Sequence, residues 1–404
     1  MTAISDKRIL SVLCALALCG ILTAGLWPFH TPKNDVRWLS NNDGLQIGKY
    51  GSVISRNEFK EELAANTACS IEIWLEPRTI NSSGAILAFY SGESASLPFE
   101  LRQSLGDLEL MGSRPDARPK RTKAFVDDLF NRSSPVFVTI SLNSGGTAVY
   151  ADGSFIKTFP GFRFSSRDLT GRLILGNAPA TTDSWSGRLM GMAVYEGALS
   201  ADEVSQHYKS WTTNLGQSLS QRNGTVALYA FNEKAGTVIH NLADSATDLV
   251  IPERFFVLRE RFLVPPWEEY WSGWSYWEDL LVNVSGFVPL GFCFCAYFTL
   301  VQRMKRATLA TIVLGFAVSL TIEVLQAFLP TRDSGMTDIF TNTLGTAVGA
   351  LCFTSRPVQG LLPSVARYAK DGFSGPMRGE EVQAAVLRPS HCYGCEENLT
   401  PPEK

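Results

Sequence analysis

Neither sign of charge predominates in this sequence. The 404 residues carry 36 Lys and Arg against 39 Asp and Glu, which leaves a net charge of -3. A near-neutral chain has no electrostatic reason to bind the phosphates of DNA or RNA, so nucleic acid is not expected as a partner. The length allows two or three domains.

Charge is missing altogether from residues 9–27, ILSVLCALALCGILTAGLW. A run of this length is enough to cross a hydrocarbon core about 30 Å thick. A cleaved signal peptide is the alternative, because Thr23–Gly25 supplies the small residues that a cleavage site needs. The run is longer than the apolar core of about 7–15 residues that is typical of a signal peptide. We therefore expect a retained anchor at residues 1–28.

Three further apolar runs lie late in the chain, at residues 280–301, 307–329 and 339–353. A topology of four spans places the basic residues that flank the runs on the cytoplasmic side, in agreement with the positive-inside rule. These residues are Lys7, Arg8, Arg303, Lys305, Arg306, Arg356, Arg367, Lys370 and Arg378. We expect an integral protein of a bacterial inner or plasma membrane, with both termini cytoplasmic and residues 28–278 exported.

Cysteine is nearly absent from the exported region, where Cys69 stands alone, so no disulfide can form within that region. Five cysteines lie in the apolar runs, where cysteine behaves as a small hydrophobic residue. They are Cys14, Cys19, Cys293, Cys295 and Cys352. Cys392 and Cys395 have the spacing of a redox motif or half a zinc site. A lone pair supplies too few ligands for structural zinc, and we expect neither a metal nor a cofactor.

Short segments of alternating apolar and polar residues fill the exported region, among them IEIWL, AILAFY, VFVTISL and RLMGMAVY. Such segments, separated by turns, predict an antiparallel β-sandwich over residues 36–250. Asp152-Gly153 predicts a two-residue hairpin turn, because both residues tolerate positive φ. Ser200 and Glu203 predict the capping box of a helix in LSADEVSQHYKSW. The packed side of that helix is expected at Leu199, Val204, His207 and Tyr208.

Several of these motifs, in this order, resemble a concanavalin A-like or laminin G-like jelly-roll: SIEIWLEP, YADG, LTGRLILGN and SWSGRLMGMAVYEGALSADEVSQHY. TVALYAFNEKAGTVIHNLADSA, residues 225–246, resembles the strand that usually opens such domains, but here it stands at the end. A permuted order brings both ends of the sandwich together, which suits a domain inserted between two membrane spans. The resemblance implies a glycan-binding module, and some members of the superfamily are glucanases.

A glucanase needs two carboxylates about 5–5.5 Å apart for retention or about 6.5–9.5 Å apart for inversion. No segment here has the closely spaced Glu pair of the concanavalin A-like glucanases, and no catalytic residue can be named. Glu72 shares a strand face with Trp74 and is expected to be a polar residue of the outer face. Trp74 and Trp185 are weak candidates for stacking on sugar rings, although a Trp in a sandwich is more often a core residue. Oxygen donors suited to calcium also occur in loops, but turn formation explains them equally well: Asp152, Asp168 and Asn177.

Aromatic residues gather just before the second span, in PPWEEYWSGWSYWEDLLVN. Amphipathic rings at helical spacing belong at the level of the lipid headgroups. They are Trp267, Tyr270, Trp271, Trp274, Tyr276 and Trp277. We predict an interfacial helix that runs into the span, and a sugar-binding aromatic surface is the less favoured alternative.

Each of the last three spans carries an acid and an amide three or four residues apart, near the outer leaflet. The three pairs are Asp279 with Asn283, Glu323 with Gln326, and Asp338 with Asn342. Lipid exposure costs about 2.5–3.5 kcal/mol per ionised group, so these faces should turn toward one another. Glycines should let the helices approach closely, at Gly286, Gly345 and Gly349. Arg332 is the nearby cation and is expected to pair with one of the three acids. The structural alternative is a hydrogen-bond network that joins the helices and binds no ligand.

The same segments resemble the VanZ-like membrane family, in NVSGFVPLGF, EVLQAFLPTR and TDIFTNTLGTAVG. In that family the matching Asp/Asn, Glu-x-x-Gln, Arg and Asp-x-x-x-Asn positions recur together. The first anchor and the segment WPFH…NDVRWLSNNDGLQIG fit the same pattern. The resemblance implies a VanZ-like region at residues 265–355. The basic residues after it predict a cytoplasmic tail at 356–404. The family is named for a teicoplanin-resistance protein, but the large inserted sandwich departs from its minimal members and argues against that role here.

The predicted fold is an all-β jelly-roll sandwich outside the membrane with an α-helical bundle of four spans. The predicted function is recognition of a cell-surface polysaccharide or the cell wall, with the polar cluster holding a cationic or hydroxyl-rich headgroup. The expected partners are membrane lipids and a glycan or lipid-linked sugar. We do not favour an enzyme, because no catalytic residue can be named. The rival is a membrane hydrolase or transferase that acts on a lipid-linked sugar with Glu323 or Asp338 as general base. A third option is an adhesion module on a plain anchor.

Overall fold

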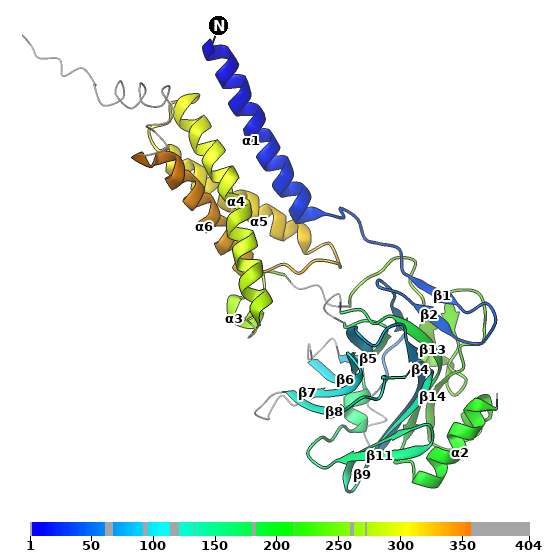
Figure 1. The fold of residues 1–404 in the computed structure, drawn as a ribbon. Helices are drawn as coiled ribbons and strands as arrows, with labels where there is room; N and C mark the ends of the chain where they lie inside the picture. Colours follow the sequence, from blue (N-terminus) through cyan, green and yellow to red (C-terminus); the bar gives the residue numbers. More distant parts are fainter. Residues whose placement is uncertain are drawn as a thin grey trace, which may run out of the picture. The chain divides into compact units, whose positions relative to one another are not determined.

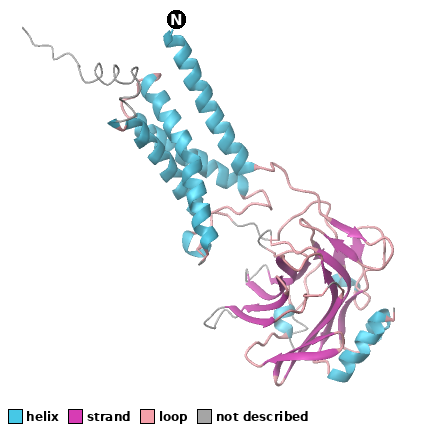
Figure 2. Cartoon of the chain, viewed as in Figure 1, coloured by secondary structure: helices cyan, strands magenta, loops and turns pink. Residues whose placement is uncertain are grey.

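A computed structural model describes residues 2–60, 68–91, 96–113, 121–132, 134–179, 183–213, 215–258, 262–270 and 273–356. Figures 1 and 2 show strands in the middle of the chain and long helices in the segments before and after them. Trp271, Cys392 and Cys395 lie outside the described residues, as does nearly all of the predicted tail.

All strand pairs of the first sheet are antiparallel, in the order β1-β2-β13-β4-β9-β10-β11, and β14 also pairs with β13. The strands are β1 (Val36–Trp38), β2 (Leu45–Ile47), β4 (Cys69–Pro77), β9 (Val136–Asn143), β10 (Gly146–Ala151), β11 (Ser154–Phe159), β13 (Gly187–Glu196) and β14 (Thr225–Tyr229). The late segment at residues 225–246 therefore contributes a strand beside β13, in a sheet that otherwise uses earlier parts of the chain.

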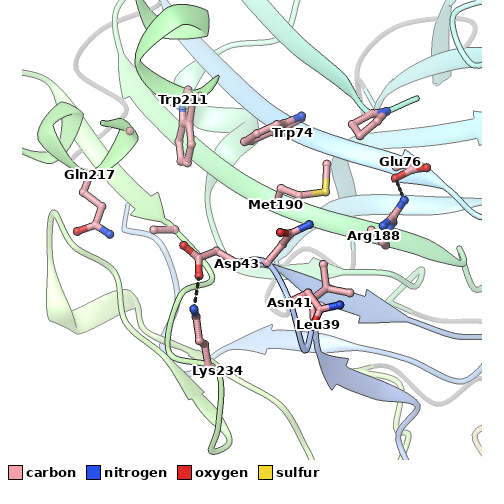
Figure 3. Close-up of a pocket in the computed structure, with 14 residues that line it drawn as sticks. Leu39, Asn41, Asp43, Trp74, Glu76, Arg188, Met190, Trp211, Gln217 and Lys234 are labelled. Atoms are coloured by element: carbon pink, nitrogen blue, oxygen red, sulfur yellow. Dashed lines mark ion pairs between the residues drawn. The ribbon is translucent and has the colours of Figure 1, made fainter. Parts of the chain in front are cut away.

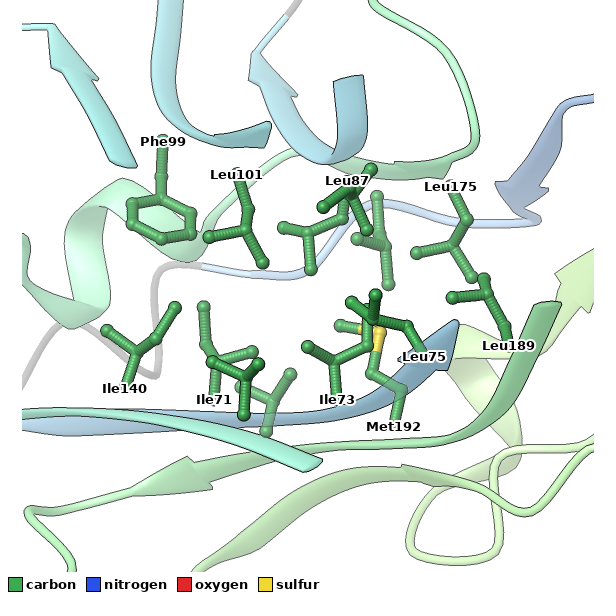
Figure 4. Close-up of a cluster of buried hydrophobic side chains, with 14 of the residues drawn as sticks. Ile71, Ile73, Leu75, Leu87, Phe99, Leu101, Ile140, Leu175, Leu189 and Met192 are labelled. Carbon is green, nitrogen blue, oxygen red and sulfur yellow. The ribbon is translucent and has the colours of Figure 1, made fainter. Parts of the chain in front are cut away.

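The second sheet is also antiparallel, in the order β15-β16-β3-β12-β5-β6-β7-β8. Its strands are β3 (Val53–Ser55), β5 (Ser83–Ser91), β6 (Ser96–Ser104), β7 (Asp107–Ser113), β8 (Arg121–Val126), β12 (Arg172–Leu175), β15 (Val238–Ile239) and β16 (Leu249–Val250). Apolar side chains of the two sheets face each other, for example Ile71 and Ile73 from one and Leu87 and Leu101 from the other (Figure 4). The two sheets form the predicted sandwich, because apolar residues of both sheets are buried in this shared core.

The two local predictions for the sandwich are confirmed. Asp152 and Gly153 join β10 to β11 with φ of 51° and 77°. Helix α2 (Ala201–Thr212) begins after Ser200, whose side chain accepts a hydrogen bond from the Glu203 N–H, while the Glu203 carboxylate accepts one from the Ser200 N–H. Short 3-10 helices occur at η2 (Ser166–Leu169), η3 (Gly216–Gln221) and η4 (Ser245–Thr247).

The apolar runs form helices α1 (Thr2–Leu26), α4 (Trp274–Leu300), α5 (Ala307–Gln326) and α6 (Met336–Thr354). Within the described residues, three segments are long and apolar enough to cross a membrane: Lys7–Leu26, α4 and α5. Helix α6, expected as the fourth span, is 19 residues long but is not one of these three.

The sequence predicted that the aromatic segment forms one helix continuous with the span. This prediction is wrong, because the structure has two separate helices. A short helix α3 (Pro266–Glu269) ends at Tyr270, and α4 begins after Gly273. Trp267, Tyr270 and Trp274 are exposed. The break separates Glu268 and Glu269 from the axis of α4, which brings them into the site described below.

Glycines let α6 approach α4 as predicted, at two of the three positions. A Cβ at Gly345 would lie 2.1 Å from the Val284 carbonyl oxygen, and one at Gly349 would lie 2.1 Å from that of Val288. Gly286 has open space beside it, so its expected role in close packing is wrong.

Candidate functional site

The loop before α6 is held against the segment that carries α3. Val264 pairs with Gly335, and the Val264 N–H donates to the Ser334 carbonyl oxygen at 3.0 Å. The Glu269 carboxylate accepts from both the N–H and the hydroxyl of Thr337 in the first turn of α6. A carboxylate is favourable there because the first N–H groups of a helix lack partners within the helix. A side chain at Gly335 would collide with Glu269, so this contact depends on glycine.

These contacts close one wall of a cavity of about 440 Å³, which we call the acidic pocket. Its lining includes five carboxylates: Glu268, Glu269, Asp279, Asp333 and Asp338. No Lys or Arg is among the described residues that line it. The rings of Tyr270 and Tyr276 also line it and meet edge to face at 5.4 Å between centroids. The pocket thus combines negative charge with aromatic surface, which is an arrangement suited to a cation.

A buried polar layer adjoins the pocket and joins α4, α5 and α6. Asn283 Nδ2 donates to Asp338 Oδ1 at 2.8 Å, and Asn342 Nδ2 donates to Ser319 Oγ at 3.0 Å. Glu323 is 1% exposed and accepts from the Gly335 N–H at 2.8 Å. These bonds satisfy polar groups that lipid would leave without partners.

Gln326 and Arg332 contact the end of α1. Gln326 Nε2 donates to the Gly25 carbonyl oxygen at 2.8 Å. Arg332 donates to the carbonyl oxygens of Trp27 and Ala24. Among the described residues Arg332 forms no ion pair within 4.0 Å, so the expected pairing with Glu323, Asp338 or Asp279 is wrong.

The seven residues predicted as one cluster are therefore divided. Asp279 and Asp338 line the acidic pocket, and Asn283 reaches it through Asp338. Glu323 and Asn342 lie in the buried layer, while Gln326 and Arg332 hold α1. The sequence did not predict five residues of the pocket: Glu268, Glu269, Tyr270, Tyr276 and Asp333. The first four lie in the aromatic segment, for which the sequence favoured a position at the lipid interface, and Asp333 lies in a turn that has no periodic face.

The two Trp candidates on the sandwich have different surroundings. Trp185 is 1% exposed and donates from Nε1 to Gln103 Oε1 at 2.9 Å. It belongs to the core and cannot stack on a sugar. Trp74 is only partly buried and lines an open groove of about 490 Å³ on the outer face of the first sheet (Figure 3).

Glu72 lies on the outer face of the sheet with Trp74, as expected, but it is fully buried, which the sequence did not predict. Helix α2 covers it, and its carboxylate accepts from Tyr195 Oη at 2.8 Å and Trp211 Nε1 at 3.4 Å. His207 Nδ1 lies 2.9 Å from its other oxygen. Burial and the neighbouring Glu72 carboxylate raise the pKa of Tyr195 well above its ordinary value.

The calcium candidates all have protein partners. Asp152 accepts from the Phe137 N–H and pairs with Arg132 at 2.6 Å. Asp168 completes the capping box of η2, and Asn177 Oδ1 accepts from the Ser184 hydroxyl. Within the described ranges, no group of three or more His, Cys, Asp or Glu is placed to hold a metal ion.

The region that carries the acidic pocket has a family match. Residues 216–357 match the VanZ/LLP1 family model. This VanZ-like region covers α3 to α6 and also β14, β15 and β16 of the sandwich. Residues 48–205 match the model described as the concanavalin A-like lectin/glucanases superfamily. Both resemblances expected from the sequence are confirmed.

No curated protein matches the chain. Solved structures that resemble it include the receptor-binding domain of botulinum neurotoxin C/D mosaic serotype, at 15% identity and a TM-score of 0.33, covering 44% of this chain and 45% of that one. The binding domain of botulinum neurotoxin DC in complex with SialylT has 14% identity, a TM-score of 0.35 and coverage of 50% and 48%. A SAP-like pentraxin from Limulus polyphemus has 16% identity, a TM-score of 0.29 and coverage of 43% and 79%. The chain spans less than half of either neurotoxin chain, and similarity this low implies nothing about ligand or activity.

Proposed function

We propose that this protein is an integral membrane protein of the cell envelope that recognises a glycan outside the membrane and holds a lipid headgroup at its VanZ-like region. Its parts would be an anchor at residues 1–28, a sandwich at 36–250, a membrane region at 265–355 and a cytoplasmic tail at 356–404. The three apolar helices and the two family matches support this organisation. Helix α6 would be the fourth span, with residues 28–278 exported and both termini cytoplasmic.

The acidic pocket is the observation that carries the headgroup proposal. Its carboxylates favour a cation, and the paired rings of Tyr270 and Tyr276 favour an ammonium group, which aromatic faces attract through their quadrupole. Hydroxyl-rich headgroups would find acceptors there, but they would not neutralise the charge. The ligand class that fits best is therefore a headgroup that bears an ammonium.

The test uses the purified full chain in nanodiscs of mixed phosphatidylethanolamine and phosphatidylglycerol, with retained lipids identified by native mass spectrometry. The protein should retain phosphatidylethanolamine preferentially. Asp279→Asn should weaken that retention about tenfold, the order expected when one hydrogen bond to a charged group is lost. Glu278→Gln is the matched control, because Glu278 is also exposed on α4 but does not line the pocket. Equal retention of both lipids, or the same loss in both variants, would contradict the proposal.

A membrane enzyme acting on a lipid-linked sugar is the second candidate, and one observation favours it. Asp338 lines the pocket and accepts a hydrogen bond from Asn283, so a bound substrate would meet a positioned carboxylate. Glu323 suits the role of general base less well, because it is buried and already accepts from Gly335. Release of product from a labelled lipid-linked sugar by the wild type, and its absence with Asp338→Asn, would favour the enzyme.

A further inference from the structure

The groove beside Trp74, which we call the sheet groove, lies where α2 stops covering the first sheet. Helix α2 ends at Thr212, and the outer faces of β4 and β13 continue past it. The lining comes from both strands, from Trp211 of α2, and from the segments between β1 and β2, after α2 and between β14 and β15. The volume of about 490 Å³ is in the range of small-ligand sites, about 300–1,000 Å³.

Strand register sets the floor of the sheet groove. Trp74 and Glu76 are two apart on β4, so their side chains share a face. On β13 the pairing shifts between Leu189 and Gly191, so Met190 is an extra residue opposite Trp74. A bulge of this kind re-aims a side chain. Figure 3 shows Met190 between the Trp74 ring and the polar groups of the lining.

Trp211 forms a fixed wall of the sheet groove. A Cβ at Gly191 would lie 2.3 Å from its ring, and one at Gly216 would lie 2.6 Å from it, so the ring is held against two glycines. Its Nε1 also donates to the buried Glu72 carboxylate at 3.4 Å. The wall is rigid, whereas Trp74 beside it remains partly exposed. A partly exposed indole beside a rigid aromatic wall can pack against the C–H face of a sugar ring.

Charges in the sheet groove balance. Glu76 pairs with Arg188, and Asp43 pairs with Lys234 at 3.4 Å. Figure 3 shows one ion pair on either side of Met190, with Gln217 on the same side as Asp43. Asn41, Asn42 and Gln217 add amides, which both donate and accept hydrogen bonds. Such a lining offers many hydrogen bonds to hydroxyls but no net charge to attract an ion.

We infer that the sheet groove is the glycan site of the sandwich and that it binds an uncharged oligosaccharide, with one sugar ring stacked on Trp74 and its hydroxyls bonded to the amides and paired charges. This inference rests on the proposed function and specifies the site and the ligand class.

The test titrates the full chain in detergent with neutral tetrasaccharides of β-1,4-linked glucose, β-1,4-linked N-acetylglucosamine and α-1,4-linked glucose, and with anionic tetragalacturonate. Binding is measured by saturation-transfer NMR and calorimetry. Trp74→Ala should weaken binding of a neutral tetrasaccharide about tenfold or more, as expected for an aromatic hot spot. Trp74→Phe should restore much of it. The matched control is Phe155→Ala, since Phe155 is an exposed aromatic on β11, at the edge of the same sheet.

The outcomes separately test the groove as the binding site, the neutral ligand class, and glycan recognition itself. Loss with Trp74→Ala and full binding by the control would support the site. Unchanged binding by Trp74→Ala would overturn the groove assignment while leaving glycan recognition standing, and binding of tetragalacturonate alone would overturn the neutral class. No binding of any saccharide by the wild type would overturn glycan recognition itself. If Trp74→Ala shifts the unfolding transition, Gln217→Ala replaces it, because the Gln217 side chain is exposed and its loss should weaken binding without affecting the fold.

Discussion

Arg332 donates two hydrogen bonds to the carbonyl oxygen of Trp27, at 2.8 Å from Nη2 and 3.1 Å from Nε. Gln326 adds a bond to the Gly25 carbonyl, two residues earlier in the chain. The last carbonyls of a helix have no partner within the helix, and a cation there also complements the helix dipole. Residues at the end of α5 and in the following turn thus cap α1.

Removing this cap should loosen α1. We expect Arg332→Ala to lower the stability of the detergent-solubilised protein by about 1 kcal/mol, as for a typical hydrogen bond. Adding Asp338→Asn should not recover the loss, because Arg332 contacts α1 and not a carboxylate, and the two effects should be additive. Lys305→Ala in the turn between α4 and α5 is the control. Thermal unfolding of the single and double variants measures these changes in stability. Recovery of stability in the double variant would instead support the ion pair between Arg332 and an acid that the sequence predicted.

The approach of α6 to α4 should depend on Gly345. Gly345→Ala would place a Cβ 2.1 Å from the Val284 carbonyl oxygen, so the helices must separate. We expect a loss of about 1–3 kcal/mol, the usual cost of overpacking. Gly286→Ala is the matched control, because it meets nothing within 4 Å and alanine favours a helix by up to about 1 kcal/mol. Equal unfolding temperatures for the two variants would show that the helices do not pack in this way.

Alkaline pH should destabilise the sandwich through Tyr195. Burial and Glu72 raise the pKa of Tyr195 in the folded state above its ordinary value of 10.0. The unfolded chain therefore loses this proton first, so the stabilisation is intact below pH 10 and is lost as the pH rises above it. Tyr195→Phe has no such proton, and its stability should fall less steeply between pH 10 and pH 11. Urea unfolding across that range measures the difference, and parallel curves would contradict the assignment.

Local rules predicted the parts of the fold that depend on neighbouring residues. The Asp152-Gly153 turn and the Ser200–Glu203 capping box needed only adjacent chemistry, and both are present. The burial of Glu72 was not predicted, because it depends on α2, which is more than a hundred residues later in the sequence. The cover over a strand face cannot be read from that strand alone.

The site was predicted in part for the same reason. Helical spacing placed Asp279 and Asn283 on one face of α4, and the cost of exposing ionised groups to lipid predicted that Asp338 of α6 would face them. It could not show that Arg332 turns to α1, because a residue in a turn has no face set by periodicity. Nor could it add Glu269, which ends a separate short helix, α3, before α4 begins at Trp274.

The proposed topology places the sandwich outside the membrane, anchored by the helices, with both termini in the cytoplasm. Alkaline phosphatase and green fluorescent protein fused in turn after residues 150, 304 and 404 test this most directly, because the first is active only outside the cytoplasm and the second fluoresces only within it. We expect phosphatase activity at 150 and fluorescence at 304 and 404. Fluorescence at 150, with no phosphatase activity there, would contradict it.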